Sequence, residues 1–198
     1  MKTIYLVRHG QKQSHAGDPG LTEVGVQQAQ ETGTYLKQFP ITKIISSPFK
    51  RTVETAFHIG QALDLEHHID SLLEERMNWD TADINRNEFL EEWVKSTHDR
   101  TYLPKYGRSS FLTGERVRQL IESVPADDAH LLLVTHGGAI LDYLRNVFGD
   151  QKLSGLKSQY EAGTDYQMRN CAVNKVVIGE KHSLELLNYA EHLSQLSE

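Results

Sequence analysis

Cysteine and long apolar runs are the features that this sequence has least of. Its 198 residues include one cysteine, Cys171, so the chain forms neither an internal disulfide nor a multi-cysteine metal cluster. No apolar run approaches the ~20 residues of a membrane-spanning helix. The first run, residues 3–7, ends at Arg8 and is shorter than the roughly 7 to 15 apolar residues of a signal peptide. We therefore expect a cytoplasmic protein without a membrane partner, in which Cys171 is a small buried side chain.

An excess of positive charge is also missing. The chain carries 21 Lys and Arg against 27 Asp and Glu, a net charge of −6 with histidine neutral. Proteins that bind nucleic acid present a basic surface, so we expect no nucleic-acid partner. Any anion-binding site has to be assembled from a few local cations. The composition is typical of a folded globular chain, and the length fits one domain over residues 1–198.

The apolar pattern alternates between strand-like runs and stretches of helical spacing. Strand-like runs occur at residues 3–7, 43–46, 130–135, 172–178 and 183–189. Helical spacing follows Thr22, Pro48 and Gly137, and it also covers residues 115–124. Thr22 is predicted to cap the first helix, and Ser47 with Pro48 to begin the second. The alternation predicts a three-layer α/β/α fold with a mainly parallel sheet, in which residues 130–135 form the central strand.

Three of these strands end in residues suited to chemistry. The first leads into Arg8 and His9, the second into Arg51, and the central one into His136. Ligands of open α/β sheets bind at the carboxyl ends of the strands, so we expect these side chains to converge. Arg51 lies in a first helical turn, where a cation is disfavoured unless an anion faces it. Free helix N-termini themselves bind phosphate, so the sequence predicts a phosphate site at this edge.

His9 is the candidate nucleophile of that site. A nucleophilic imidazole must be neutral, and the charges of nearby arginines lower its pKa. Gly10 follows directly and lets the backbone approach a ligand closely. This arrangement suits attack of His9 on a phosphorus atom.

Four spaced motifs contain these residues. They are Arg8-His9-Gly10, Leu21-Thr22-x-x-Gly25-x-x-Gln28-Ala29, Ser46-Ser47-Pro48-x-x-Arg51-Thr52-x-x-Thr55-Ala56, and Thr135-His136-Gly137-Gly138. In this order they resemble the histidine phosphatase superfamily, which includes cofactor-dependent phosphoglycerate mutases and many small phosphatases. The end of the chain, residues 188–193, is also similar to small bacterial members, so the resemblance covers nearly the whole sequence. It implies a phosphoglycerate mutase-like fold.

The resemblance also implies a covalent mechanism. His9 would become a phosphohistidine that water later hydrolyses, while Arg8, Arg51 and His136, with Gly137, would bind the phosphoryl group. The substrate would be a small-molecule or protein phosphomonoester. No metal and no cofactor is implied, and the strand-end motifs hold none of the carboxylates that a two-metal site needs.

The family's proton donor is a glutamate in a Leu-x-Glu stretch after the third strand. Leu73-x-Glu75-Arg76 resembles this stretch, which favours Glu75, with the adjacent Glu74 as the competing candidate. Family members often carry Glu-Thr or Gln-Thr after Arg-His-Gly, whereas this chain has Gln11 and Lys12. A hydroxyl near the phosphate must then come from elsewhere, and Ser14 is one candidate.

Residues 77–112 form an insertion where family members build a lid over the site. It is rich in aromatic residues and its charges nearly cancel, which favours a phosphatase over an enzyme that retains a small polyanion. The alternatives are a phosphoglycerate-type mutase, which uses the same residues, and a non-catalytic phospholigand-binding domain. Silent members generally lose the nucleophile or an arginine, and this chain keeps both. The sequence predicts no oligomeric state.

Overall fold

The core of the molecule is a six-stranded sheet. The computed structural model describes residues 1–79, 84–125, 130–153 and 168–194. The strands are β1 (Lys2–Arg8), β2 (Lys43–Ser46), β3 (His67–Ile69), β4 (His130–Thr135), β5 (Val173–Ile178) and β6 (Ser183–Tyr189). Their order is β3-β2-β4-β1-β5-β6. The first four are parallel, and β5 and β6 are added antiparallel at one edge.

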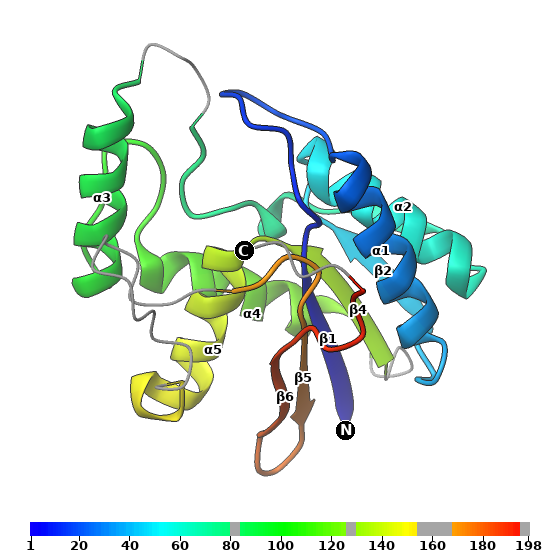
Figure 1. The fold of residues 1–198 in the computed structure, drawn as a ribbon. Helices are drawn as coiled ribbons and strands as arrows, with labels where there is room; N and C mark the ends of the chain where they lie inside the picture. Colours follow the sequence, from blue (N-terminus) through cyan, green and yellow to red (C-terminus); the bar gives the residue numbers. More distant parts are fainter. Residues whose placement is uncertain (80–83, 126–129, 154–167, 195–198) are drawn as a thin grey trace.

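Helices cover both faces of this sheet. They are α1 (Glu23–Leu36), α2 (Lys50–Leu63), α3 (Arg86–His98), α4 (Ser110–Ser123) and α5 (Gly137–Lys152). Figure 1 shows α1 and α2 packed together on one face and α4 and α5 on the other. This arrangement confirms the predicted three-layer α/β/α fold, with β4 in the middle of the sheet.

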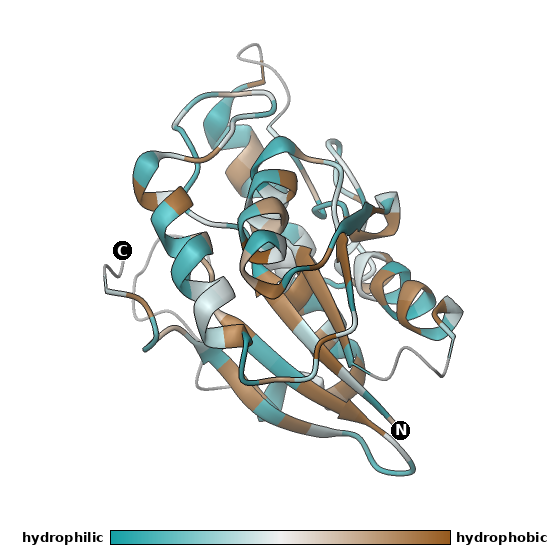
Figure 2. Cartoon of the chain, turned by 90° about the vertical axis from the view of Figure 1, so that its right-hand side faces the viewer, coloured by the Kyte–Doolittle hydropathy of each residue, from teal (hydrophilic) through white to brown (hydrophobic). Residues whose placement is uncertain are grey.

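The central strands are apolar on both faces because both faces are covered. In β1, Ile4 and Leu6 pack on the side of α4 and α5, whereas Tyr5 and Val7 pack on the side of α2. Figure 2 shows these strands as a largely hydrophobic layer between the helices. Cys171 is fully buried among the apolar residues, and burial raises the pKa of its thiol to about 12. Its predicted place in the core is confirmed.

Helix starts differ from the prediction in two places. Thr22 caps α1 as expected, accepting a hydrogen bond from Gly25 N at 3.0 Å. The predicted start of α2 at Ser47 and Pro48 is wrong, because α2 begins at Lys50 with Phe49 as its N-cap. The Ser47 hydroxyl contacts His136 instead, so it is not available as a cap. The third predicted helix begins five residues earlier, at Ser110, because Ser109 caps α4.

The insertion at residues 77–112 contains α3, which lies apart from the sheet at the upper left of Figure 1. Its two ends are joined at the base, where Arg108 N donates to Arg76 O at 3.0 Å. Residues 80–83 of the insertion lie outside the described residues, as do residues 154–167 of the second segment that breaks the alternation. Within the described parts, no helix is long and apolar enough to cross a membrane.

Candidate active site

The three strand ends meet at the carboxyl edge of the sheet. β1 pairs with β4 so that Arg8 lies opposite Thr135, and β4 also pairs with β2. The rings of His9 and His136 consequently lie 5.5 Å apart, edge to face. A cavity of about 240 Å³ opens here, lined by Arg8, His9, Lys12, His15, Gly17, Pro19, Arg51, Glu75, Met77, Asn78, Trp79, Phe89 and Trp93. The predicted convergence of Arg8, His9, Arg51 and His136 is what the fold produces.

The loop after β1 is held close to α1 by residues of the motifs at 21–29 and 46–56. A Cβ atom at Gly10 would lie 2.5 Å from Gly25 O, closer than real side chains approach, so both glycines permit this crossing. Gly10 N donates to Thr55 Oγ1 at 3.0 Å, and Gln11 N donates to Gln28 Oε1 at 2.9 Å. These motif residues therefore position the loop that carries His9.

His9 is buried and neutral. Burial is the main cause that holds its pKa well below the usual value, and the charges of Arg8 and Arg51 lower it further. The effect of the arginines was predicted from the sequence, whereas the larger effect of burial was not. His9 Nδ1 lies 2.7 Å from Gly10 O, so a proton on Nδ1 is donated to this carbonyl. Nε2 then carries the free lone pair that a nucleophile requires.

His136 lies beside a hydroxyl that the sequence reasoning missed. Its Nε2 is 2.8 Å from Ser47 Oγ, and both residues are buried. Burial, followed by the charge of Arg51, holds the pKa of His136 well below its usual value. Among the described residues, the buried His136 Nδ1 has no hydrogen-bond partner, and neither has Arg8 Nε. Two buried polar atoms at one edge fit an anionic ligand, because natural proteins rarely leave such atoms unsatisfied.

The two arginines approach the cavity from different elements. Arg51 lies in the first turn of α2, where its guanidinium stacks 4.7 Å from the centre of the Phe49 ring and donates to Asn78 Oδ1 at 3.1 Å. Arg8 donates to Met168 O and packs against Gly137 at the start of α5. The N-caps of α2 and α5 make no side-chain capping bond, and both helices begin at this edge of the sheet. The two arginines and the N-termini of α2 and α5 thus lie at the same edge of the sheet.

Glu75 and Glu74 take different directions. The carboxylate of Glu75 lines the cavity and accepts hydrogen bonds from Arg76 N at 2.8 Å and Gly138 N at 3.1 Å. Glu74 lies outside the cavity lining and approaches Arg116 at 3.9 Å. The short 3-10 helix ends at Leu73, and of the two glutamates that follow it only Glu75 lines the cavity that His9 also lines.

The loop after Gln11 brings other residues than Ser14 to the cavity. Ser14 is exposed and does not belong to the lining, whereas Lys12 and His15 do. Burial, then the charges of Arg51 and Arg8, lower the pKa of Lys12. The sequence shows Lys12 as a departure from the family pattern but predicts no role for it in the site. In the part of the chain that the structure describes, no group of three or more His, Cys, Asp or Glu could hold a metal ion.

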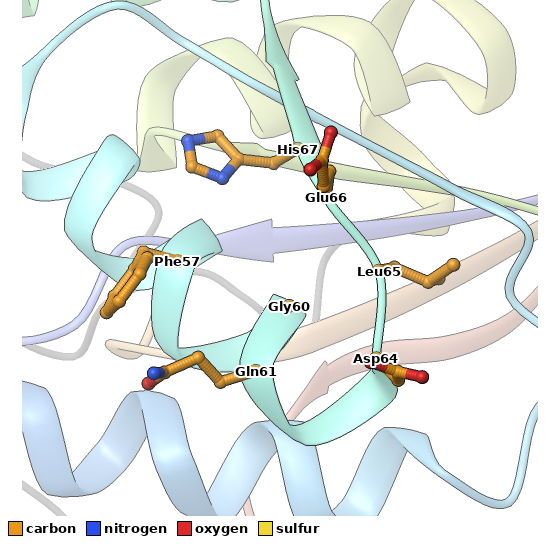
Figure 3. A pocket seen from close by; sticks show the side chains of 7 residues that line it. All are labelled: Phe57, Gly60, Gln61, Asp64, Leu65, Glu66 and His67. Atoms are coloured by element: carbon orange, nitrogen blue, oxygen red, sulfur yellow. The ribbon is translucent and has the colours of Figure 1, made fainter.

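A second, larger cavity lies away from these residues. It measures about 450 Å³ and is built from the end of α2 and the segment that leads into β3 (Figure 3). Phe57 and Gln61 come from the helix, and His67 comes from the strand. None of the candidate catalytic residues lines it, so size alone does not identify the site.

The model of the histidine phosphatase superfamily (branch 1) matches residues 4–190. This chain belongs to the histidine phosphatase superfamily. It is 31% identical over 202 aligned positions to the probable phosphoglycerate mutase GpmB of Escherichia coli strain K12 / DH10B, and 33% identical over 196 positions to that of Proteus mirabilis. Each match covers 89% of this chain and 85% of the relative.

Solved structures of phosphatases and of a mutase share the fold of this chain. Phosphoglycerate mutase from Bacillus anthracis superposes with a TM-score of 0.75 at 19% identity, covering 98% of this chain and 95% of that one. A mycobacterial glucosyl-3-phosphoglycerate phosphatase bound to VO3 gives 0.72 at 22%, with 95% and 99% covered. Phosphoserine phosphatase from Entamoeba histolytica, in complex with 3-phosphoglyceric acid, gives 0.69 at 23%, with 98% and 100% covered.

The lowered pKa values of His9 and His136 predict how the stability of this protein depends on pH. In the unfolded chain His9 and His136 take up protons below pH about 6.5, whereas the folded chain does not until its lower pKa values are reached. The free energy of unfolding should therefore fall as pH drops below 6.5, by up to about 1.4 kcal/mol per pH unit for each histidine. Urea unfolding at pH 7.5, 6.0 and 5.0 measures this slope. His136→Gln should flatten it, and an unchanged slope in that variant would contradict the assignment.

Gly138 allows Glu75 to lie against the start of α5. A Cβ atom at this position would be 2.4 Å from Glu75 Oε1 and 2.7 Å from Trp93 Cη2. We expect Gly138→Ala to displace the carboxylate and to lower the hydrolysis of alkyl phosphates about 10- to 100-fold, with a smaller loss for nitrophenyl phosphate. Gly179→Ala, whose nearest atoms lie 3.8 Å away, is the matched control and should hydrolyse both esters normally. Equal rates for Gly138→Ala and the control would show that Glu75 tolerates the added methyl group.

Proposed function

We propose that this histidine phosphatase hydrolyses phosphomonoesters through a phosphohistidine at His9. The observation that carries the proposal is a neutral, buried His9 with Nε2 free, in a cavity that also receives Arg8 and Arg51. A neutral imidazole keeps its lone pair, and the two guanidinium groups attract the phosphoryl dianion.

The first step transfers the phosphoryl group to the enzyme. His9 Nε2 forms a bond to phosphorus while the bond from phosphorus to the ester oxygen breaks. Arg8, Arg51 and His136 stabilise the charge on the phosphoryl oxygens, and protonated Glu75 gives its proton to the leaving oxygen. Gly137, the first residue of α5, lies beside the Arg8 side chain. The products of this step are an alcohol and a phosphoenzyme.

The second step returns the enzyme to its starting state. The Glu75 carboxylate takes a proton from a water molecule whose oxygen attacks phosphorus, and the bond between phosphorus and Nε2 breaks. Inorganic phosphate leaves, and Glu75 is again protonated. No metal takes part in either step, because the arginines supply the positive charge that metal ions supply in other phosphatases.

Two features support hydrolysis over phosphoryl return to an acceptor. A mutase needs further cations for the second anion of its substrate. Arg76 is bound to Asp142 in the interior, and Arg86 and Arg108 of the insertion do not belong to the cavity lining. The rest of the lining includes three large aromatic side chains. A phosphoglycerate-type mutase is the second candidate, favoured by the names of the relatives that are about 30% identical and by Lys12 in the cavity.

The partition of the phosphoenzyme separates the two candidates. The enzyme is primed with 2,3-bisphosphoglycerate and supplied with 3-phosphoglycerate, and the formation of 2-phosphoglycerate is followed against free phosphate. We expect phosphate with little isomer. Isomer formation that outruns phosphate release tenfold or more would establish the mutase, and binding without either product would favour a phospholigand-binding domain.

A further inference from the structure

Three aromatic side chains line the cavity together with the cations. Trp79 follows the segment that carries Glu75, and Phe89 and Trp93 lie on α3, four residues apart and so on one face of the helix. All three are half-buried, so part of each ring remains open to the cavity. The lining therefore has a cationic part at the strand ends and an apolar part on the insertion.

Trp93 lies next to the proton donor that the proposed function requires. Both the Trp93 ring and the Glu75 carboxylate pack on Gly138, on the side where a Cβ atom would project. A proton donor must be within hydrogen-bond reach of the leaving oxygen. The part of the substrate that is attached to the leaving oxygen is therefore expected to lie beside Trp93.

Contacts with neighbouring groups hold the three rings of this aromatic wall, which are those of Trp79, Phe89 and Trp93. The guanidinium of Arg76 lies 4.5 Å from the centre of the Trp93 ring and is itself held by Asp142 at 2.8 and 2.9 Å, Ser96 at 3.0 Å and Thr97 at 2.7 Å. Trp79 Nε1 donates to Ile84 O at 2.9 Å. The Phe89 ring lies 6.4 Å from Tyr106, nearly parallel to it. Rings that are already fixed in the free protein bind a flat partner without a further loss of side-chain freedom.

We propose that Trp79, Phe89 and Trp93 form a leaving-group subsite for an aromatic ring, so that the preferred substrates are aryl and arylalkyl phosphomonoesters. This inference rests on the proposed function and deepens it. Aromatic rings gain from burial of their apolar area and from offset or edge-to-face contacts with other rings. A small hydrophilic leaving group such as glycerate makes neither of these favourable interactions and would leave the indole rings exposed to water. The cavity of about 240 Å³ suits one ring beside a phosphoryl group.

The test compares two substrates whose leaving alcohols have similar acidity. A difference in their rates then reports binding of the ring and not the ease with which the alcohol leaves. We would compare kcat/KM for 2-phenylethyl phosphate and butyl phosphate, and expect a preference of at least tenfold for the phenyl compound. Trp93→Leu and Phe89→Leu keep an apolar side chain but remove the ring, and each should lower this preference at least fivefold. Phe57→Leu is the matched control, because this exposed aromatic residue lines the remote cavity of Figure 3, and it should leave the preference unchanged.

A preference near one in the unaltered enzyme would overturn the proposal. So would Trp93→Leu and Phe89→Leu variants that slow both esters equally, since the rings would then serve only to pack the insertion onto the body. His9→Ala is measured in parallel with both esters. If that variant still released phosphate, the proposed function would fail, whatever the substrate preference. Phenyl phosphate and a phosphotyrosyl peptide, assayed side by side, distinguish a small aryl ester from a protein as the source of the ring.

Discussion

His9→Ala is expected to abolish both phosphate release and the phosphoenzyme. The loss should reach about 10⁴-fold or more, because no other side chain replaces an imidazole that forms the covalent bond. Rapid quenching with a ³²P-labelled ester should trap a phosphoprotein from the unaltered enzyme that is stable in base and labile in acid, as a phosphorus–nitrogen bond requires. The same quench of the variant should yield no labelled protein.

His68→Ala is the control for this experiment. His68 is exposed on the edge strand β3, so its replacement should change neither the labelling nor the rate. Binding of inorganic phosphate tests whether the His9→Ala site is still assembled, because Arg8 and Arg51 remain. A His9→Ala variant that bound phosphate and kept more than a small fraction of its turnover would rule out the covalent mechanism.

Glu75→Gln is expected to show a loss that depends on the leaving group. Glutamine keeps the size of the side chain, and its carbonyl oxygen can accept the hydrogen bond from Gly138 N, but its amide has no acidic proton to transfer to the leaving oxygen. Removal of a positioned proton donor costs typically 10²- to 10⁴-fold, so we expect a loss in this range for alkyl phosphates. Nitrophenyl phosphate should lose much less in the first step, since nitrophenolate leaves without a proton. Rates of phosphoenzyme formation for the two esters measure the difference.

Glu74→Gln is the matched control, because Glu74 is the adjacent residue and has the same chemistry. Its carboxylate faces Arg116 and not the cavity, so both esters should react within about twofold of the normal rate. A larger and leaving-group-dependent loss in Glu74→Gln would assign the proton donor to Glu74.

The layered fold and the location of the site follow from local patterns in the amino-acid sequence. Residues 131–134 of β4, for example, are all apolar because helices cover both faces of the strand, and this pattern is local in the chain. Parallel strands also bring their carboxyl ends to one edge, so residues that directly follow a strand must meet there. Arg8, His9 and His136 were predictable for that reason, and Arg51 because it begins the helix after the second strand.

The side chains that complete the cavity depend instead on contacts between distant parts of the chain. Glu74 and Glu75 are identical in type and adjacent, and the direction of each depends on how the chain leaves the 3-10 helix and crosses the start of α5. The position of Ser47 before Pro48 predicts a helix cap. In the structure its hydroxyl instead contacts His136, which is far away in the sequence. The aromatic wall likewise depends on Arg76, which joins α3 to α5 through contacts between distant residues. Local sequence patterns do not predict such contacts, because each contact forms only when separate elements pack together.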